Sequence, residues 1–115
     1  MKKWIGSYIL DEDNNPVPVD TLEWAKWLEQ NRTRKIVKQT TLPNGKWVST
    51  VFLGLDHNYS ENGPPLLFET TIFVFASDGK LDEEYMERYS TWEAAEQGHE
   101  KCCLMTEPYY DSEDN

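Results

Sequence analysis

An aspartate and a histidine are adjacent at positions 56 and 57, where a predicted strand ends. A histidine beside a carboxylate can act as a tuned general base or as a metal ligand. Glu69 follows on the far side of the intervening loop and can approach both residues across a hairpin. Acid–base or metal-dependent catalysis by Asp56, His57 and Glu69 is therefore one hypothesis. The alternative is that Asp56 and His57 only hold the loop in shape through hydrogen bonds.

His99 is a second candidate, because it lies on the apolar stripe of a predicted helix over residues 90–104. A histidine in that position is usually a hydrogen-bonded core residue. It becomes a metal ligand only if the fold brings it to His57, since two histidines with one or two carboxylates can bind a metal. The sequence has no H-E-x-x-H, Cys-x-x-Cys or G-x-S-x-G pattern. We therefore expect no metal and no cofactor.

The loop over residues 56–66 is also a candidate binding surface. The residues that we expect to contact a partner are Asp56, His57, Asn58, Tyr59, Pro64, Pro65 and Glu69. Prolines stiffen a loop, and a stiff loop loses less entropy when it binds. The same stiffness lowers the cost of folding, so the prolines alone do not distinguish the two roles.

Three predicted strands position this loop. Asn44-Gly45 predicts a tight hairpin between strands at 34–42 and 46–54, because these residues tolerate the positive φ angles that the turn needs. A strand at 67–76 follows the loop. Both faces of the 46–54 strand carry large apolar side chains, which predicts an inner strand covered at least partly on both sides.

Further strands and two helices complete the pattern. Residues 4–10 alternate as a strand does, and residues 84–89 predict an edge strand guarded by charges. Two capping boxes predict the helix starts: Asp20 to Glu23, and Ser90 to Glu93. The order β-α-β-β-β-(β)-α predicts an α+β fold. We expect an antiparallel sheet of about four to five strands with two helices packed on one face.

The chain has 115 residues and a formal net charge of −10. Its length predicts a single domain, which we place at residues 1–106, followed by an acidic flexible tail at residues 107–115. The acidity argues against direct binding to nucleic acids, because phosphate contacts need Lys and Arg. No apolar stretch is long enough for a signal peptide or a membrane span, so we expect a cytoplasmic protein without membrane contact.

Charge is distributed unevenly along the chain. Basic residues gather between positions 32 and 46, and acidic residues between positions 82 and 100. These segments can pair within the fold, mark opposite faces of a homo-oligomer, or leave an acidic face for a basic partner. The two cysteines, Cys102 and Cys103, are adjacent, and we expect them to be reduced because a bridge between neighbours is strained.

Three stretches resemble a widespread family of small bacteriophage and prophage proteins. They are VSTVFLGLDH at 48–57, PPLLFET at 64–70, and RYSTWEAA at 88–95 with Gly98-His99, so the resemblance covers about residues 20–104. It implies a phage-type accessory protein in the cytoplasm of a bacterial host, and no reaction is known for the family.

Small acidic phage proteins often act by binding, so the resemblance favours a binding function over catalysis. We expect the partner to be a host protein or a small ligand, and the function to be inhibition or sequestration of a host component such as a defence factor. Two alternatives stay open. One is an enzyme that uses Asp56, His57 and Glu69; the other is a structural or assembly protein of a virion or homo-oligomer.

Overall fold

The computed structural model describes residues 6–60 and 62–106. Its elements are β1 (Ser7–Leu10), β2 (Pro16–Val19), α1 (Thr21–Gln30), β3 (Ile36–Thr41), β4 (Trp47–Phe52), β5 (Phe68–Phe75), β6 (Leu81–Tyr89) and α2 (Trp92–Thr106). The last four strands form an antiparallel sheet in the order β3-β4-β5-β6, and β1 pairs with β2 in a separate sheet. The predicted α+β class is confirmed. The start of the predicted first strand and the predicted tail lie outside the described residues.

The β1–β2 hairpin contains a strand, β2, that the sequence did not predict. Pro18 pairs with Tyr8 in this hairpin, and prolines argue against a strand because they cannot donate to the ladder. Prolines are tolerated here because β1 and β2 form a separate two-stranded sheet, in which each strand is an edge strand. The turn is held by the Asp11 carboxylate, which accepts hydrogen bonds of 2.9 Å from the backbone N–H groups of Asp13 and Asn15.

The predicted helices are both present, and their starts illustrate how local capping works. The Asp20 carboxylate accepts a 2.8 Å hydrogen bond from the Glu23 N–H, which confirms the cap of α1. At α2 the capping group is Thr91 rather than Ser90, because the Thr91 hydroxyl accepts a 3.0 Å bond from the Ala94 N–H. Either hydroxyl suits an N-cap, so only the backbone path selects between them.

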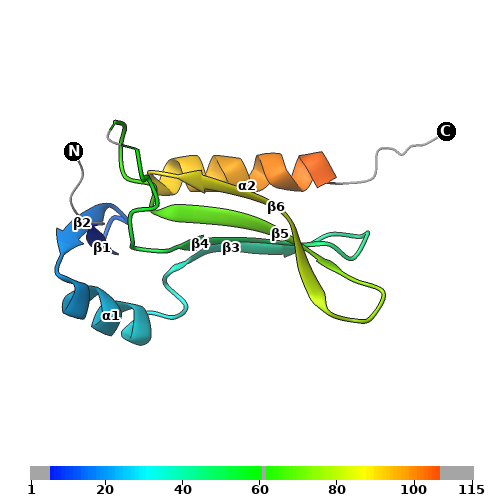
Figure 1. The fold of residues 1–115 in the computed structure, drawn as a ribbon, viewed down its shortest axis with the longest axis horizontal. Helices are drawn as coiled ribbons and strands as arrows, with labels where there is room; N and C mark the ends of the chain where they lie inside the picture. The colour runs from blue at the N-terminus through cyan, green and yellow to red at the C-terminus, as the bar shows by residue number, and fades with distance from the viewer. Residues whose placement is uncertain (1–5, 61, 107–115) are drawn as a thin grey trace.

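The expected placement of both helices on one face is wrong for α1. Helix α2 packs across all four strands of the larger sheet, whereas α1 packs against β1; in Figure 1 the two helices lie on opposite sides of the sheet. The chain enters α1 directly from β2, so α1 follows the small sheet. It is anchored at the end of β4, where the Trp24 indole donates to the Leu53 carbonyl at 3.1 Å and the Trp27 ring meets Phe52 edge-on.

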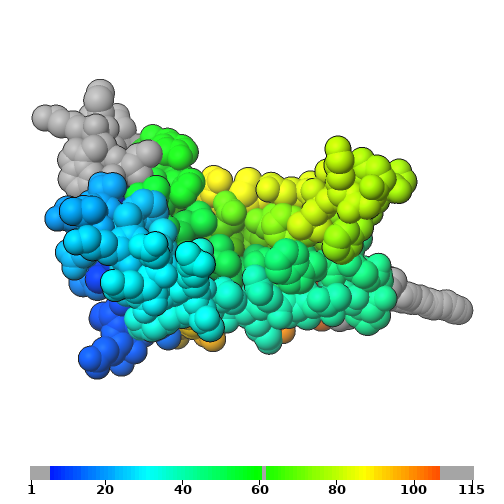
Figure 2. All heavy atoms as spheres, turned by 90° about the horizontal axis from the view of Figure 1, so that it is seen from below, coloured from blue at the N-terminus to red at the C-terminus, as the bar shows by residue number. Residues whose placement is uncertain are grey.

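Beside α1, one face of the larger sheet is not covered by any described helix. Figure 2 looks at the molecule from this side and shows β3 to β6 at the surface. Trp47 and Phe73 stack on each other across this face, with ring centroids 5.1 Å apart. Strand β4 is therefore an inner strand as predicted, but its second face is shielded by a neighbouring aromatic ring rather than by a helix.

The core between α2 and the sheet consists of two apolar clusters. One contains Leu10, Phe52, Leu67, Phe68 and Ala95, and the other contains Leu42, Val48, Ile72, Cys102 and Cys103. Both cysteines are buried in the second cluster. Among the described residues, no helix is long and apolar enough to cross a membrane.

Candidate functional site: the 56–66 loop

The loop between β4 and β5 lies at the end of the sheet where the small β1–β2 sheet packs (Figure 1). Two backbone hydrogen bonds hold its base, one to Gly6 just before β1 and one across the loop itself. The Asp56 N–H donates to the Gly6 carbonyl at 3.0 Å, and the His57 N–H donates to the Leu66 carbonyl at 2.9 Å. The rigid strands thus set the position of the loop, which is a common arrangement for binding residues.

Asp56 acts as the internal clamp of the loop. Its side chain is only 5% exposed. One carboxylate oxygen accepts hydrogen bonds from the Asn58 N–H at 2.7 Å and the Leu66 N–H at 3.0 Å. Because these two N–H groups lie at opposite ends of the loop, the carboxylate holds both arms together. This is the structural role that the sequence analysis weighed against catalysis.

Asn58 continues the clamp toward the loop tip. Its amide nitrogen donates to the carbonyls of Asn62 at 3.1 Å and Pro64 at 2.8 Å, while its amide oxygen accepts from the Ser60 N–H at 3.0 Å. The backbone on either side of the loop tip is therefore held by hydrogen bonds from a side chain of the loop itself.

His57 and Tyr59 form the outward side of the loop. The His57 Nδ1 atom is 2.8 Å from the Leu55 carbonyl oxygen, to which it donates. The His57 ring lies edge-on to the Tyr59 ring, with centroids 6.2 Å apart. The Tyr59 side chain is 67% exposed. The predicted binding residues thus include one large aromatic group presented to solvent on an ordered backbone.

Glu69 is held by groups of the sheet rather than by the loop. Its carboxylate accepts a 3.0 Å hydrogen bond from the Arg88 guanidinium and a 3.2 Å bond from the Thr71 hydroxyl. Asp56, His57 and Glu69 therefore have separate partners: loop N–H groups, a backbone carbonyl and an arginine. The structure gives each of them a role in shaping the β4–β5 hairpin.

We expect Asp56→Ala to loosen the loop and to lower the free energy of unfolding by about 1–3 kcal/mol, because the Asn58 and Leu66 N–H groups lose their acceptor. Hydrogen exchange at these two amides measures the local effect, and urea unfolding measures the global one. Asp56→Asn keeps one acceptor oxygen and is the milder control. Unchanged exchange at both amides in Asp56→Ala contradicts the clamp.

His99 is a core residue with both ring nitrogens engaged. Its Nε2 atom is 2.8 Å from the Thr40 hydroxyl, and its Nδ1 atom is 2.7 Å from the Thr50 hydroxyl, which also bonds to Thr70. The imidazole is fully buried. This polar layer lies between the two apolar clusters and fixes the register of α2 on the sheet. Among the described residues, no group of three or more His, Cys, Asp or Glu side chains could hold a metal.

Burial lowers the pKa of His99 below its ordinary value of 6.5; the carboxylate of Glu100 raises it and the ammonium of Lys38 lowers it by smaller amounts. The unfolded chain then binds a proton at a higher pH than the folded chain does. We expect stability to be constant above about pH 6.5 and to fall below it, by up to about 1.4 kcal/mol per pH unit. Urea midpoints between about pH 7.5 and about pH 5 measure this slope. His99→Gln should remove most of this dependence of stability on pH. If the variant shows the same dependence, other titratable groups cause it.

The basic and acidic segments pair within the fold, one of the alternatives that the sequence left open. Lys38 lies 2.6 Å from Glu100, and Lys46 lies 2.8 Å from Glu84. The second pair lines a pocket that the sequence analysis did not anticipate. In the sequence only the charge pattern pointed to this pocket, because its lining residues come from four separate segments of the chain.

Comparison with known proteins gives no match: no family model fits the sequence, and neither the curated proteins nor the solved structures contain a similar chain. The function must therefore be argued from the site itself.

Proposed function

We propose that this chain acts by binding rather than by catalysis, and that the 56–66 loop contacts the partner. The observation that carries the proposal is an ordered loop with an exposed aromatic tip. The side chains of Asp56 and Asn58 hold the backbone through five hydrogen bonds within the loop, and Tyr59 projects into solvent. An ordered loop loses little entropy on binding, and tyrosine is among the residues that most often dominate interface energies.

The contacts of the ionisable side chains favour binding over acid–base chemistry. The Asp56 carboxylate is turned into the loop, and the Glu69 carboxylate is held by Arg88. A general base needs a lone pair directed at a substrate, and both carboxylates direct oxygens at groups of the fold instead. His57 remains at the surface, beside Tyr59, where it suits recognition.

The proposed context is a phage-type accessory protein that inhibits or sequesters a host component in the cytoplasm. The sequence resemblance of residues 48–57, 64–70 and 88–95 supports this context. The first two stretches flank the loop, and the loop clamp residue Asp56 is part of the first. The net charge of −10 favours a partner that presents basic groups, because complementary charge speeds association.

The test is capture of a partner from bacterial host lysate by the full-length protein, followed by a dissociation constant for the recovered species. We expect Tyr59→Ala to weaken binding roughly 30-fold or more, since hot-spot aromatics commonly contribute at least 2 kcal/mol. His57→Ala should weaken it less. Native mass spectrometry of the recovered protein distinguishes a small ligand from a protein partner.

Phe75→Ala is the matched control, because Phe75 is also an aromatic residue with 67% exposure but belongs to the β5 end of the sheet. Equal loss of binding in Phe75→Ala and Tyr59→Ala would contradict a contact centred on the loop. A captured species that binds both variants as tightly as the original protein would exclude the loop as its site.

A further inference from the structure

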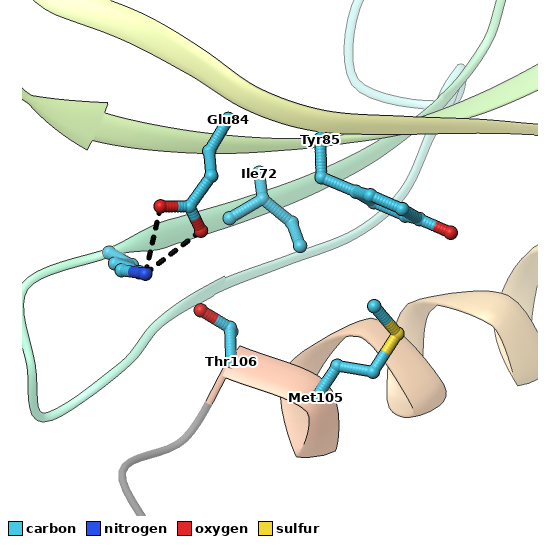
Figure 3. A pocket seen from close by; sticks show the side chains of 6 residues that line it. Ile72, Glu84, Tyr85, Met105 and Thr106 are labelled. Carbon is cyan, nitrogen blue, oxygen red and sulfur yellow. Dashed lines mark hydrogen bonds and ion pairs between the residues drawn. The ribbon is translucent and has the colours of Figure 1, made fainter.

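A pocket of about 240 Å³ lies at the opposite end of the sheet from the 56–66 loop, under the last turn of α2. Figure 3 shows the side chains that line it: Lys46, Ile72, Glu84, Tyr85, Met105 and Thr106. They come from the residue before β4, from β5, from β6 and from the end of α2. Only the packed fold brings these four segments together.

An irregularity in β6 builds the pocket. Neighbouring strand residues normally point to opposite faces, yet Glu84 and Tyr85 both line this pocket. The register explains this: Ile72 pairs with Tyr85 but Phe73 pairs with Glu83, so Glu84 is an extra residue in a β-bulge. Bulges redirect side chains and are frequent beside functional sites.

The pocket has a polar end and an apolar end. At the polar end the Lys46 ammonium donates to both oxygens of the Glu84 carboxylate, at 2.9 and 2.8 Å. The two charges cancel, so the pocket offers hydrogen bonds without a net charge. At the apolar end the Tyr85 ring and the Met105 thioether lie across from each other, and Ile72 lies between Glu84 and Tyr85 (Figure 3).

The Thr106 hydroxyl is a buried polar group at this pocket that lacks a hydrogen bond among the described residues. Its Oγ1 atom is buried and, within residues 6–60 and 62–106, has no hydrogen-bond partner. In Figure 3 this oxygen points toward the side of the Lys46–Glu84 pair. Buried hydroxyl groups nearly always have a partner, so a polar atom of a bound molecule is the natural acceptor or donor here.

We propose that this pocket binds a small aromatic molecule that carries a neutral hydroxyl or amide group. A cavity of about 150 Å³ already holds benzene, so 240 Å³ accommodates a ring with one polar substituent. The ring packs between Tyr85 and Met105, which suit aromatic and sulfur contacts. The substituent bonds to Thr106 and must be neutral, because a charged group would compete with the Lys46–Glu84 pair.

The test titrates the full-length, ¹⁵N-labelled protein with phenol, toluene and benzoate and follows the backbone amide signals of Ile72, Tyr85 and Thr106. Phenol should bind saturably and roughly three- to tenfold more tightly than toluene, as one neutral hydrogen bond provides. Benzoate should bind more weakly than phenol. Thr106→Val should abolish the preference for phenol and leave toluene binding unchanged.

Thr41→Val is the matched control, because Thr41 is an exposed threonine on the neighbouring strand β3, and it should keep the preference for phenol. N-acetyltyrosinamide distinguishes the source of the ring: tighter binding than phenol indicates a tyrosine of a peptide, and weaker binding indicates a free small molecule. The proposal is overturned if no saturable shift occurs, if phenol and toluene bind equally, if benzoate binds best, or if Thr106→Val keeps the preference. None of these outcomes bears on the 56–66 loop.

Discussion

Gly54→Ala should lower the free energy of unfolding by about 3–5 kcal/mol, through two separate costs. Gly54 has a φ of +78°, and an L-residue in this left-handed region loses about 1–2 kcal/mol. The added Cβ would also lie 2.3 Å from Trp24 Nε1 and 2.8 Å from the Tyr8 carbonyl oxygen. The carbonyl belongs to the backbone of β1 and cannot rotate away, so overpacking adds a further cost.

The same substitution should separate α1 and the small sheet from the end of β4. Gly54 is the point where they meet: the Tyr8 N–H donates to the Gly54 carbonyl at 2.7 Å, and the Trp24 indole donates to the adjacent Leu53 carbonyl. Urea unfolding measures the total loss, and hydrogen exchange in α1 and β1 measures the detachment.

Gly45→Ala is the control that measures the backbone cost alone, so the difference between the two variants gives the steric cost. Gly45 has a φ of +87°, and nothing lies within 4 Å of an added Cβ, so only the backbone cost of about 1–2 kcal/mol applies. If Gly54→Ala is no more destabilising than Gly45→Ala, the close contact with Trp24 and Tyr8 does not contribute.

Gly98→Ala should lower the free energy of unfolding by about 2–3 kcal/mol, although alanine is the better helix former. Gly98 is buried in α2, and an added Cβ would lie 2.2 Å from the Cζ and hydroxyl oxygen of Tyr89. The Tyr89 ring is packed against the core and must leave its place or push α2 away from the sheet. The helix preference for alanine, about 1 kcal/mol, offsets only part of this cost.

The sign of this effect should reverse in a Tyr89→Leu background. Leucine lacks the distal ring atoms that meet the added Cβ. In that background Gly98→Ala should gain up to about 1 kcal/mol from helix propensity. The four chains form a double-mutant cycle; urea unfolding of each gives the coupling free energy. Additive effects would show that Tyr89 is not what requires a glycine at position 98.

The hairpin and helix limits were predictable because their signals are local. Asn44-Gly45 marks a tight turn that the structure contains: the Asn44 side chain accepts from the Lys46 N–H at 2.9 Å. The Asp20 cap likewise involves a residue only three positions away. Strand β2 was not predicted because its prolines are a local signal against a strand. In the structure, pairing with β1 outweighs that local signal.

The contacts of the candidate site residues could be predicted only in part. Within the described residues 56–60 and 62–66, side-chain hydrogen bonds join the two arms of the loop between β4 and β5. The sequence did not show whether the Glu69 side chain contacts that loop. In the structure Glu69 binds Arg88, which is 19 positions away and lies on the next strand. Alternation along a strand shows which face a side chain takes, but not which neighbour on that face it meets.

By itself, the sequence determined the α+β class, the central hairpin and both helices, because periodicity, turn chemistry and capping act over a few residues. Only the tertiary structure decided that α1 and α2 lie on opposite sides of the sheet and that Asp56 clamps the loop from within. It also decided that a bulge turns Glu84 toward Lys46, near a Thr106 hydroxyl that has no hydrogen-bond partner among the described residues. These features arise where segments distant in the sequence pack together, and their partners cannot be read from either segment alone.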